Sequence, residues 1–490
     1  MAQPLSPFVR TAGLPHLRYW ASVLGLALAD ATSFVLAYLI CRAGHSVPSL
    51  AFFQGSSRVN AVTIDVFLIL GSAYVLVRYL SGDYGRRQLF WDGAKITTVA
   101  TLIASVPDIL MVKLGGGIYS IFPAICSWLF VLAAVPLLRQ LVRAIMRGAG
   151  IWNIPTAIFG AGTRTIEIAA ALRGSLSLGF DVRWLVMETP DQLVPAELSA
   201  LSPIIILDAA HTIEAVSNVG CRQAIVASED LQSGNFAEVV HHLIEINIPV
   251  AIIPSLNRFP LAGASTNYFF GRDILLMQIR SNVQRLHWRL IKRSFDIVVS
   301  ALLIALLSPV FLVLSIAIKL DSRGHVTYFQ RRVGRGGMEF KCYKFRSMVP
   351  NADDLLERWK TENPELYKDF LVSFKLRNDP RITRIGKWLR SSSLDEAPQL
   401  WNVLRGDMSL VGPRPIPEQQ LRDQYGSAAQ LYMRVRPGIT GLWQISGRSE
   451  TTSDQRVVLD EWYILNWSFW YDIVILIQTA WIVFSRKGAY

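Results

Sequence analysis

The membrane topology of this chain is decided by residues 292–323, KRSFDIVVSALLIALLSPVFLVLSIAIKLDSR. As a helix, the apolar part, about 295–318, could just span the ~30 Å hydrocarbon core of a bilayer. Basic residues flank both ends, however, and Ser308-Pro309 lies at the centre, where proline removes one backbone hydrogen bond and bends a helix. We therefore predict a re-entrant helix, about 293–319, that is broken at Ser308-Pro309 and returns to the cytoplasmic leaflet. An ordinary kinked span is the alternative.

The composition is typical of a membrane protein. Of the 490 residues, 51% are hydrophobic, and the formal net charge is +12. High apolarity with a basic excess suggests polar parts that face the anionic cytoplasmic leaflet. We find no helix-turn-helix, zinc-finger or RNP pattern, so nucleic acid is not an expected partner. The 4 cysteines lie far apart without a CxxC pair, which predicts neither a disulfide framework nor a zinc site.

Residues 1–147 contain four apolar stretches, at about 19–41, 61–80, 96–113 and 120–138. Each is near the ~20 residues that a helix needs to cross a bilayer, so we predict a multi-pass bundle of four transmembrane helices. The third stretch carries Pro107 and Asp108 and is the weakest. Basic residues precede the first stretch, fill the second loop and follow the fourth, which predicts that both ends of the bundle are cytoplasmic.

Residues 148–256 alternate short β-branched runs with helical patterns, which predicts a parallel α/β sheet. We expect a cytosolic Rossmann-like domain, followed by a polar, aromatic linker at 257–291. The turn Gly160-Ala161-Gly162 resembles the start of a dinucleotide fingerprint, but Thr165 stands where the third glycine would be, and the acidic residue after the second strand is missing. A tight turn without a nicotinamide cofactor is therefore the expectation.

Residues 292–490 are charged and rich in motifs, and we predict an α/β catalytic domain there. This domain ends with an apolar segment at about 467–485. Its apolar part, 473–484, is too short to span a bilayer, and Trp, Arg and Lys residues around it favour the headgroup zone. The segment is therefore predicted to be an interfacial helix.

The candidate chemistry lies in residues 393–415, SLDEAPQLWNVLRGDMSLVGPRP, which contain the adjacent carboxylates Asp395 and Glu396. Pro398 is tolerated only in the first turn of a helix. A helix is therefore predicted from near Asp395 to near Gly406, with both carboxylates at its N-terminus.

Helix capping is the simplest interpretation of the pair, with Asp395 as N-cap or Ser393 and Glu396 as a capping box. Neighbouring motifs favour phosphate chemistry instead, because they supply further polar residues: Lys344, Arg346, Arg381, Arg390, Arg405, Arg414, Arg436, Gln444 and Arg448. Arginine presents a planar fork that matches phosphate, and the prolines on both sides of Arg414 suit a preorganised anion clamp. A carboxylate nucleophile acting on a diphosphate needs such a clamp. Glu396, helped by Asp407, could hold Mg²⁺.

The motifs KFRSM, DPRITRIGKWLR, SLDEAPQLWNVLRGDMSLVGPRP, RPGITGLWQISGR and FSRKGAY occur in this order. They resemble the bacterial sugar transferase domain of the polyprenyl-phosphate phosphoglycosyl transferases, and the whole chain resembles the large members of that family. The resemblance implies that Asp395 attacks the β-phosphate of a UDP-sugar, that UMP leaves, and that undecaprenyl phosphate takes the sugar-phosphate. It also implies a metal-binding role for Glu396 and a phosphate contact for Arg414.

The implied function is the transfer of galactose-1-phosphate, or of glucose-1-phosphate as the second expectation, to undecaprenyl phosphate in the bacterial inner membrane. This step would start assembly of an O-antigen, capsule or exopolysaccharide, with Mg²⁺ as cofactor and with the catalytic domain facing the cytoplasm. Inner-membrane lipid and a second copy of the chain are further candidate partners. A membrane-tethered nucleotide sensor is the alternative from another class, and the intact carboxylate pair and arginine set argue against it.

Overall fold

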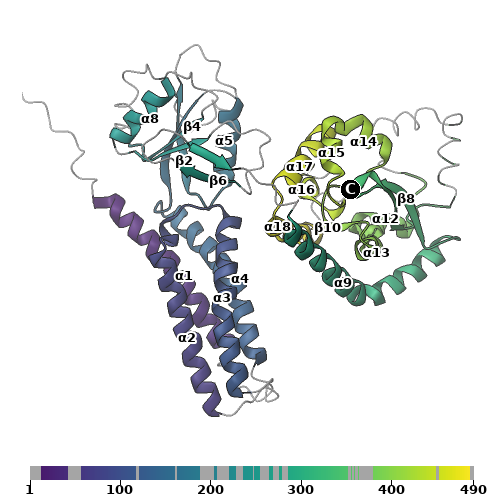
Figure 1. The fold of residues 1–490 in the computed structure, drawn as a ribbon, viewed down its shortest axis with the longest axis horizontal. Helices are drawn as coiled ribbons and strands as arrows, with labels where there is room; N and C mark the ends of the chain where they lie inside the picture. The colour runs from purple at the N-terminus through teal and green to yellow at the C-terminus, as the bar shows by residue number, and fades with distance from the viewer. Residues whose placement is uncertain are drawn as a thin grey trace, which may run out of the picture. The chain divides into compact units, whose positions relative to one another are not determined.

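The computed structural model describes residues 13–41, 57–116, 121–160, 163–187, 204–206, 220–227, 235–246, 248–253, 264–268, 275–278, 285–350, 379–447 and 452–485, with positions 352, 355, 358 and 362. The chain forms two compact units, Met1–Ser255 and Leu256–Tyr490. Figure 1 shows their helices and strands.

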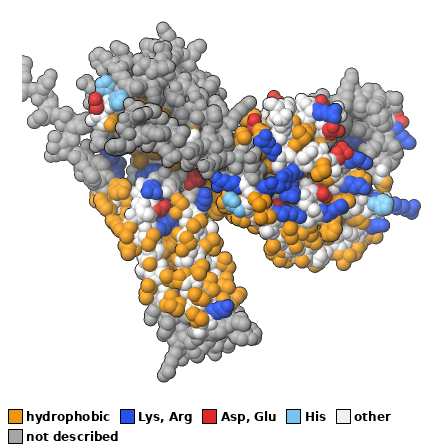
Figure 2. All heavy atoms as spheres, in the orientation of Figure 1, with side chains coloured by type: hydrophobic (Ala, Val, Ile, Leu, Met, Phe, Trp, Pro, Cys, Tyr) orange, Lys and Arg blue, Asp and Glu red, His pale blue; other side chains and the backbone are white. Residues whose placement is uncertain are grey.

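The first unit begins with four long helices: α1 (Gly13–Cys41), α2 (Ser57–Leu80), α3 (Phe90–Gly116) and α4 (Ile121–Gly148). Stretches of α1, α3 and α4 are long and apolar enough to cross a membrane, and the described part of α2 forms a shorter apolar segment. Hydrophobic side chains cover the visible face of this bundle (Figure 2). The four predicted apolar helices are therefore present, and the chain is a membrane protein. Pro107 lies inside α3 without ending it.

Buried charges hold one end of the bundle together. Arg139 in α4 pairs with Asp30 in α1 at 2.6 Å and with Asp83 in the loop after α2 at 2.9 Å. Arg78 in α2 completes the network through a 2.7 Å pair with Asp83. Breaking such a buried pair by removing one partner typically costs about 3–5 kcal/mol, because the other charge stays uncompensated. The network therefore links α1, α2 and α4 at the end from which the chain enters the sheet domain.

A parallel sheet of five strands follows: β1 (Ile154–Phe159), β2 (Phe180–Met187), β3 (Ile204–Ile206), β4 (Gln223–Ala227) and β5 (Val250–Ile253). Their order is β3-β2-β1-β4-β5. Helix α5 (Thr163–Gly174) buries Ile168 and Leu172 on one face, and α8 (Asn235–Glu245) buries Leu243 on the other. The predicted parallel α/β sheet is confirmed. Gly160 follows β1 with φ 137°, while the predicted Gly162 lies outside the described residues.

The second unit starts with a β-hairpin and one long helix, and small helices and strands then form a compact body. Its elements are β6 (Ser265–Tyr268), β7 (Leu275–Gln278), α9 (Leu286–Asp321), β8 (Thr327–Val333), β9 (Glu339–Phe345), α12 (Arg384–Ser392), α13 (Gln399–Arg405), β10 (Ser409–Val411), α14 (Glu418–Tyr425), α15 (Ala429–Tyr432), β11 (Gly438–Thr440), α16 (Leu442–Ile445), α17 (Ser453–Leu465) and α18 (Phe469–Ser485). The β6–β7 hairpin lies within the segment predicted as a linker. Helix α18 coincides with the predicted C-terminal apolar helix and is too short to be a span.

Helix α9 is long and apolar enough to cross a membrane, and it continues through Pro309 and bends instead of breaking (Figure 1). Because proline has no N–H, the carbonyl of Ala305 loses its helical partner. The hydroxyl of Ser308 donates to this carbonyl at 2.8 Å and so gives it a partner. The prediction that this helix is broken at Ser308-Pro309 is therefore wrong, because α9 is continuous there.

The two arms of α9 pack against the same unit. The N-terminal arm packs Phe295 and Leu303 against the core that contains Trp467, and the C-terminal arm buries Leu314 and Ile318 beside Phe345. A straight helix could not cover both regions, so the bend at Pro309 is part of the fold.

We predict that replacing Ser308-Pro309 by Ala-Leu straightens α9 and detaches one arm, because the restored N–H removes the cause of the bend. The measurement is labelling of a His325→Cys reporter from the periplasmic side, in a background without the native cysteines. The wild-type bend should leave the reporter unlabelled, and the double variant should expose it or fail to accumulate.

Ser308→Ala alone is the matched control, because it retains Pro309 and should retain the bend. Periplasmic labelling of the reporter in the parent protein would show that α9 spans the membrane.

Candidate active site

Asp395 and Glu396 lie in a short 3₁₀ turn, Leu394–Glu396, between α12 and α13. Ser393 adopts φ 57° and turns the chain out of α12, but its side chain makes no capping hydrogen bond. Helix α13 itself starts at Gln399, after the predicted position, and its N-cap is Pro398. The capping interpretation of the pair is therefore wrong, and the two carboxylates occupy the turn between two helices.

Cations surround Glu396. The Lys344 ammonium lies 2.7 Å from Oε1 of Glu396, and a guanidinium nitrogen of Arg414 lies 3.8 Å from the same oxygen. Lys344 belongs to β9 and is paired across the hairpin with Tyr328 of β8. The sequence motifs that contain Lys344, Glu396 and Arg414 thus meet at one point.

Asp395 is more deeply buried than a free surface carboxylate. Burial raises the pKa of Asp395 to about 6, and the neighbouring Glu396 carboxylate adds to the rise. Lys344 and Arg390 act in the opposite direction. At neutral pH the carboxylate is therefore mostly ionised and is less stabilised by solvent than an exposed one, which suits a nucleophile.

The backbone of Arg414 is held from two sides. The Tyr432 hydroxyl donates to the carbonyl of Arg414 at 3.0 Å, and the N–H of Gly438 donates to that of Pro413 at 2.8 Å. A Cβ at Gly438 would lie 2.1 Å from the nitrogen of Gly412, so this close approach of β10 and β11 requires glycine. The Arg414 guanidinium lies 5.5 Å from the centre of the Trp443 ring. These contacts hold the Arg414 guanidinium in position before a substrate binds.

Two predicted phosphate ligands have structural partners. Arg346 donates to the carbonyls of Ser322 and Arg323 at 2.7 and 3.1 Å and so closes the C-terminus of α9. Arg381 makes a bidentate pair with Asp379 at 2.9 and 2.7 Å. Both side chains are buried. By contrast, Arg390 acts on Asp395 and donates to the hydroxyl of Ser347 at 2.9 Å.

Arg405, Asp407 and Arg436 are grouped at the end of α13 that is far from Glu396. Arg405 is the last residue of α13 and Asp407 lies just after it, and their side chains are 4.0 Å apart. Arg436 donates to the carbonyl of Gly406 at 2.7 Å. Gln444 donates to the carbonyl of Ile439 at 3.2 Å. Arg448 lies outside the described residues.

Among the described carboxylates of this site, the Asp395–Glu396 pair could hold a magnesium ion. Asp407 is separated from Glu396 by α13, whose seven residues measure about 10 Å. Within the part of the chain that the structure describes, no three His, Cys, Asp or Glu side chains form a ligand cluster. Mg²⁺ commonly binds one or two carboxylates together with substrate phosphates. The pair therefore fits an ion that is shared with a diphosphate.

Tyr328 and Trp443 belong to the site but were not singled out from the sequence. Burial raises the pKa of Tyr328. The nearby Lys344 lowers this pKa, and the nearby Asp395 raises it. The register of the β8–β9 hairpin, which the sequence alone does not give, brings Tyr328 beside Lys344. Trp443 lies inside the RPGITGLWQISGR motif, so an aromatic support for Arg414 could have been sought there.

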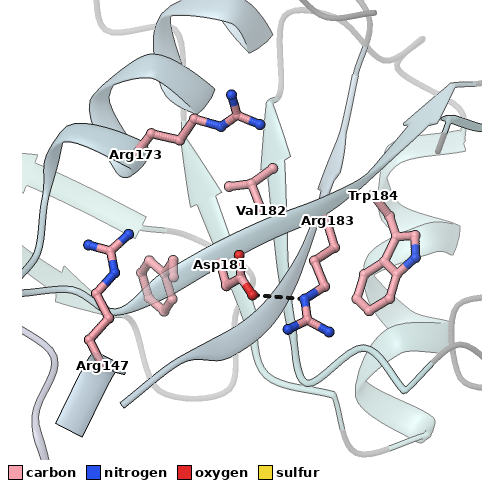
Figure 3. Close-up of a pocket in the computed structure, with 7 residues that line it drawn as sticks. Arg147, Arg173, Asp181, Val182, Arg183 and Trp184 are labelled. Atoms are coloured by element: carbon pink, nitrogen blue, oxygen red, sulfur yellow. Dashed lines mark hydrogen bonds and ion pairs between the residues drawn. The ribbon is translucent and has the colours of Figure 1, made fainter. Parts of the chain in front are cut away.

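A separate hollow of about 600 Å³ occurs in the first unit (Figure 3). It is lined by Arg147 at the end of α4, Arg173 at the end of α5 and the first residues of β2. Arg183 is paired with Asp181 at 2.8 Å. Ligands of open parallel sheets bind outside the carboxyl ends of the strands, whereas this hollow lies at the start of β2. Its position does not match a dinucleotide site.

Comparisons with known proteins identify the relatives of this chain. Residues 287–486 match the family model described as bacterial sugar transferase. The chain is 35% identical over 441 residues to the undecaprenyl-phosphate galactose phosphotransferase of Salmonella typhimurium, which covers 89% of this chain and 90% of that protein. It is 37% identical over 408 residues to the UDP-galactose-lipid carrier transferase of Erwinia amylovora, with 83% and 84% covered.

A glucose enzyme is also similar. The chain is 32% identical over 378 residues to the UDP-glucose:undecaprenyl-phosphate glucose-1-phosphate transferase of Klebsiella pneumoniae, with 74% and 75% of the two chains covered. Because these similarities extend well beyond the matched domain, the chain belongs to the bacterial sugar transferase family.

Proposed function

We propose that this protein transfers a sugar-1-phosphate from a UDP-sugar to undecaprenyl phosphate, releases UMP and so starts the assembly of a surface glycan. The observation that carries the proposal is the Asp395–Glu396 pair facing Lys344, Arg390 and Arg414. Galactose-1-phosphate is the preferred group, since two relatives with high coverage are named for galactose. Glucose-1-phosphate is the second candidate, since another relative is named for it.

In the proposed first step, the Asp395 carboxylate attacks the phosphorus that carries the sugar. The bond from this phosphorus to the bridging oxygen breaks, and UMP leaves with the electron pair. In the second step, a phosphate oxygen of undecaprenyl phosphate attacks the same phosphorus, and Asp395 leaves as a carboxylate. The products are undecaprenyl-diphospho-sugar and the free enzyme, so the atoms balance without a further reactant.

The cations around Glu396 have a defined part in this reaction. Phosphoryl transfer depends mainly on positioning and on neutralising charge at the phosphoryl oxygens. Arg414 is held by its backbone before substrate arrives, and Lys344 lies across the hairpin from Tyr328. Mg²⁺, when bound, would neutralise charge on the diphosphate, and Glu396 would hold it.

We further propose that α9 is re-entrant from the cytoplasmic face of the inner membrane and that α18 lies in the interface. The packing of both α9 arms on one unit supports this placement. The outer side of α9 exposes apolar side chains such as Leu302 and Leu306, which suits contact with lipid. This arrangement would let one active site reach a water-soluble nucleotide sugar and a lipid phosphate.

We predict that Asp395→Asn lowers turnover about 10³-fold or more while the protein stays folded, because an amide is a poor nucleophile. The measurement is UMP release by the full chain in nanodiscs with undecaprenyl phosphate, Mg²⁺ and a panel of UDP-sugars. UDP-galactose should be the best donor. When the UDP-sugar carries a label in its sugar, the parent protein should become covalently labelled with the sugar-phosphate. The Asp395→Asn variant should not acquire this label.

Asp423→Asn is the matched control, since Asp423 lies on the exposed side of α14. Undiminished turnover of Asp395→Asn would exclude the covalent mechanism. Turnover with UDP-glucose alone would support the reaction and change the sugar.

We also predict an acid limb in the pH profile. Only ionised Asp395 can attack, so kcat/KM should be full above pH 7 and fall about tenfold per unit below the pKa of about 6. Lys344 lowers the pKa of Asp395, so Lys344→Gln should move the limb to higher pH as well as reduce the rate. Lys341→Gln, an exposed change on the same strand, should leave the limb in place. A limb that stays at the same pH in Lys344→Gln would argue against Asp395 as the titrating group.

A further inference from the structure

A second, small pocket of the catalytic unit is strongly basic. It is lined by five cationic side chains, from Arg289, Lys292, Arg335, Arg434 and Arg436, and Trp467 forms part of its wall. These residues come from the start of α9, the turn between β8 and β9, the segment between α15 and β11, and the segment between α17 and α18. Four separate parts of the chain therefore converge on one pocket.

The pocket is distinct from the site at Asp395. Arg335 lies in the hairpin turn before β9, which begins at Glu339. Lys344, at the site, is five residues farther along this strand, which corresponds to about 17 Å. A phosphate bound beside Arg335 could not be attacked by Asp395.

Most of the positive charge in this pocket is uncompensated. Lys292 pairs with Asp472 at 2.5 Å, and Arg436 donates to the carbonyl of Gly406. For Arg289, Arg335 and Arg434, no carboxylate partner is found among the described residues. Burial and the neighbouring Arg289 lower the pKa of Arg335, and burial and nearby arginines lower that of Arg436. The free side chains repel one another, and a bound anion would relieve this repulsion.

Apolar surface adjoins the basic pocket. Leu286 and Leu290, in the same helical turns as Arg289, are 68% and 59% exposed. Figure 2 shows Lys and Arg side chains gathered beside a broad hydrophobic band on the visible face of this unit. A ligand that fits both features has an anionic head and a hydrocarbon tail.

We propose that this pocket binds the phosphate of an anionic glycerophospholipid of the phosphatidylglycerol class, with its acyl chains along Leu286 and Leu290. A zwitterionic lipid would bring its ammonium group against unpaired arginines, so the headgroup must carry net negative charge. The bound lipid would fix the N-terminal arm of α9 at the membrane surface. The inference uses the proposed membrane placement of α9 but not the proposed reaction.

The test is a titration of the full chain in neutral detergent with short-chain phosphatidylglycerol and phosphatidylcholine, followed by native mass spectrometry. The parent protein should bind one phosphatidylglycerol at least about tenfold more tightly than phosphatidylcholine. Arg335→Gln/Arg434→Gln should weaken binding of phosphatidylglycerol about tenfold or more, because two charge-assisted contacts are lost.

The matched control is Arg331→Gln/Arg422→Gln, which removes the same charge from exposed arginines paired with Glu339 and Glu418. It should bind phosphatidylglycerol like the parent protein. Asp395→Asn should also bind normally, which separates this proposal from the proposed reaction.

Equal affinity for both lipids, or equal weakening in the two double variants, would overturn the proposal in favour of unspecific adsorption. Displacement of phosphatidylglycerol by geranylgeranyl phosphate, with the same loss in Arg335→Gln/Arg434→Gln, would also overturn it, because the pocket would then receive the acceptor substrate.

Discussion

The catalytic unit depends on the bend of α9 at Pro309, where the carbonyl of Ala305 loses its helical partner. In hydrocarbon every backbone polar group needs a partner within the protein, and Pro309 removes the partner of this carbonyl. The Ser308 hydroxyl donates to this carbonyl at 2.8 Å, and α9 remains helical through the bend. The bend divides α9 into two arms, and both arms contact the rest of the unit. Arg293 in the first arm donates to the last carbonyls of α13 at 2.6 and 2.8 Å, and Asp321 in the second accepts the N–H of Ile385 at the start of α12 at 3.1 Å.

Asp395 lies in the turn between α12 and α13, so both arms of α9 contribute to its position. The two adjacent carboxylates then meet different surroundings. Glu396 forms the close ion pair with Lys344, whereas burial raises the pKa of Asp395. Environments that separate two neighbouring titratable groups are a common basis for dividing chemical roles. Here the division agrees with one carboxylate that attacks and one that organises charge.

Six described basic residues of the motifs divide into three groups by their contacts. Lys344, Arg390 and Arg414 surround the carboxylate pair. Arg346 and Arg381 satisfy buried carbonyl and carboxylate groups, and Arg436 lines the second pocket. An arginine guanidinium can neutralise a carboxylate, donate to a buried carbonyl or line an anion pocket. The residue type alone therefore could not assign each arginine to one of the three groups.

The sequence alone identified the apolar helices, the parallel sheet and the Asp395–Glu396 pair, because hydropathy, periodicity and motifs are local along the chain. It could not decide that Tyr328 lies beside Lys344, that Asp407 is remote from Glu396, or that the carboxylates occupy a 3₁₀ turn instead of the first turn of α13. Strand register and the packing of distant segments determine these distances. The five basic side chains of the second pocket are likewise spread from Arg289 to Arg436, and only the folded chain brings their charges together.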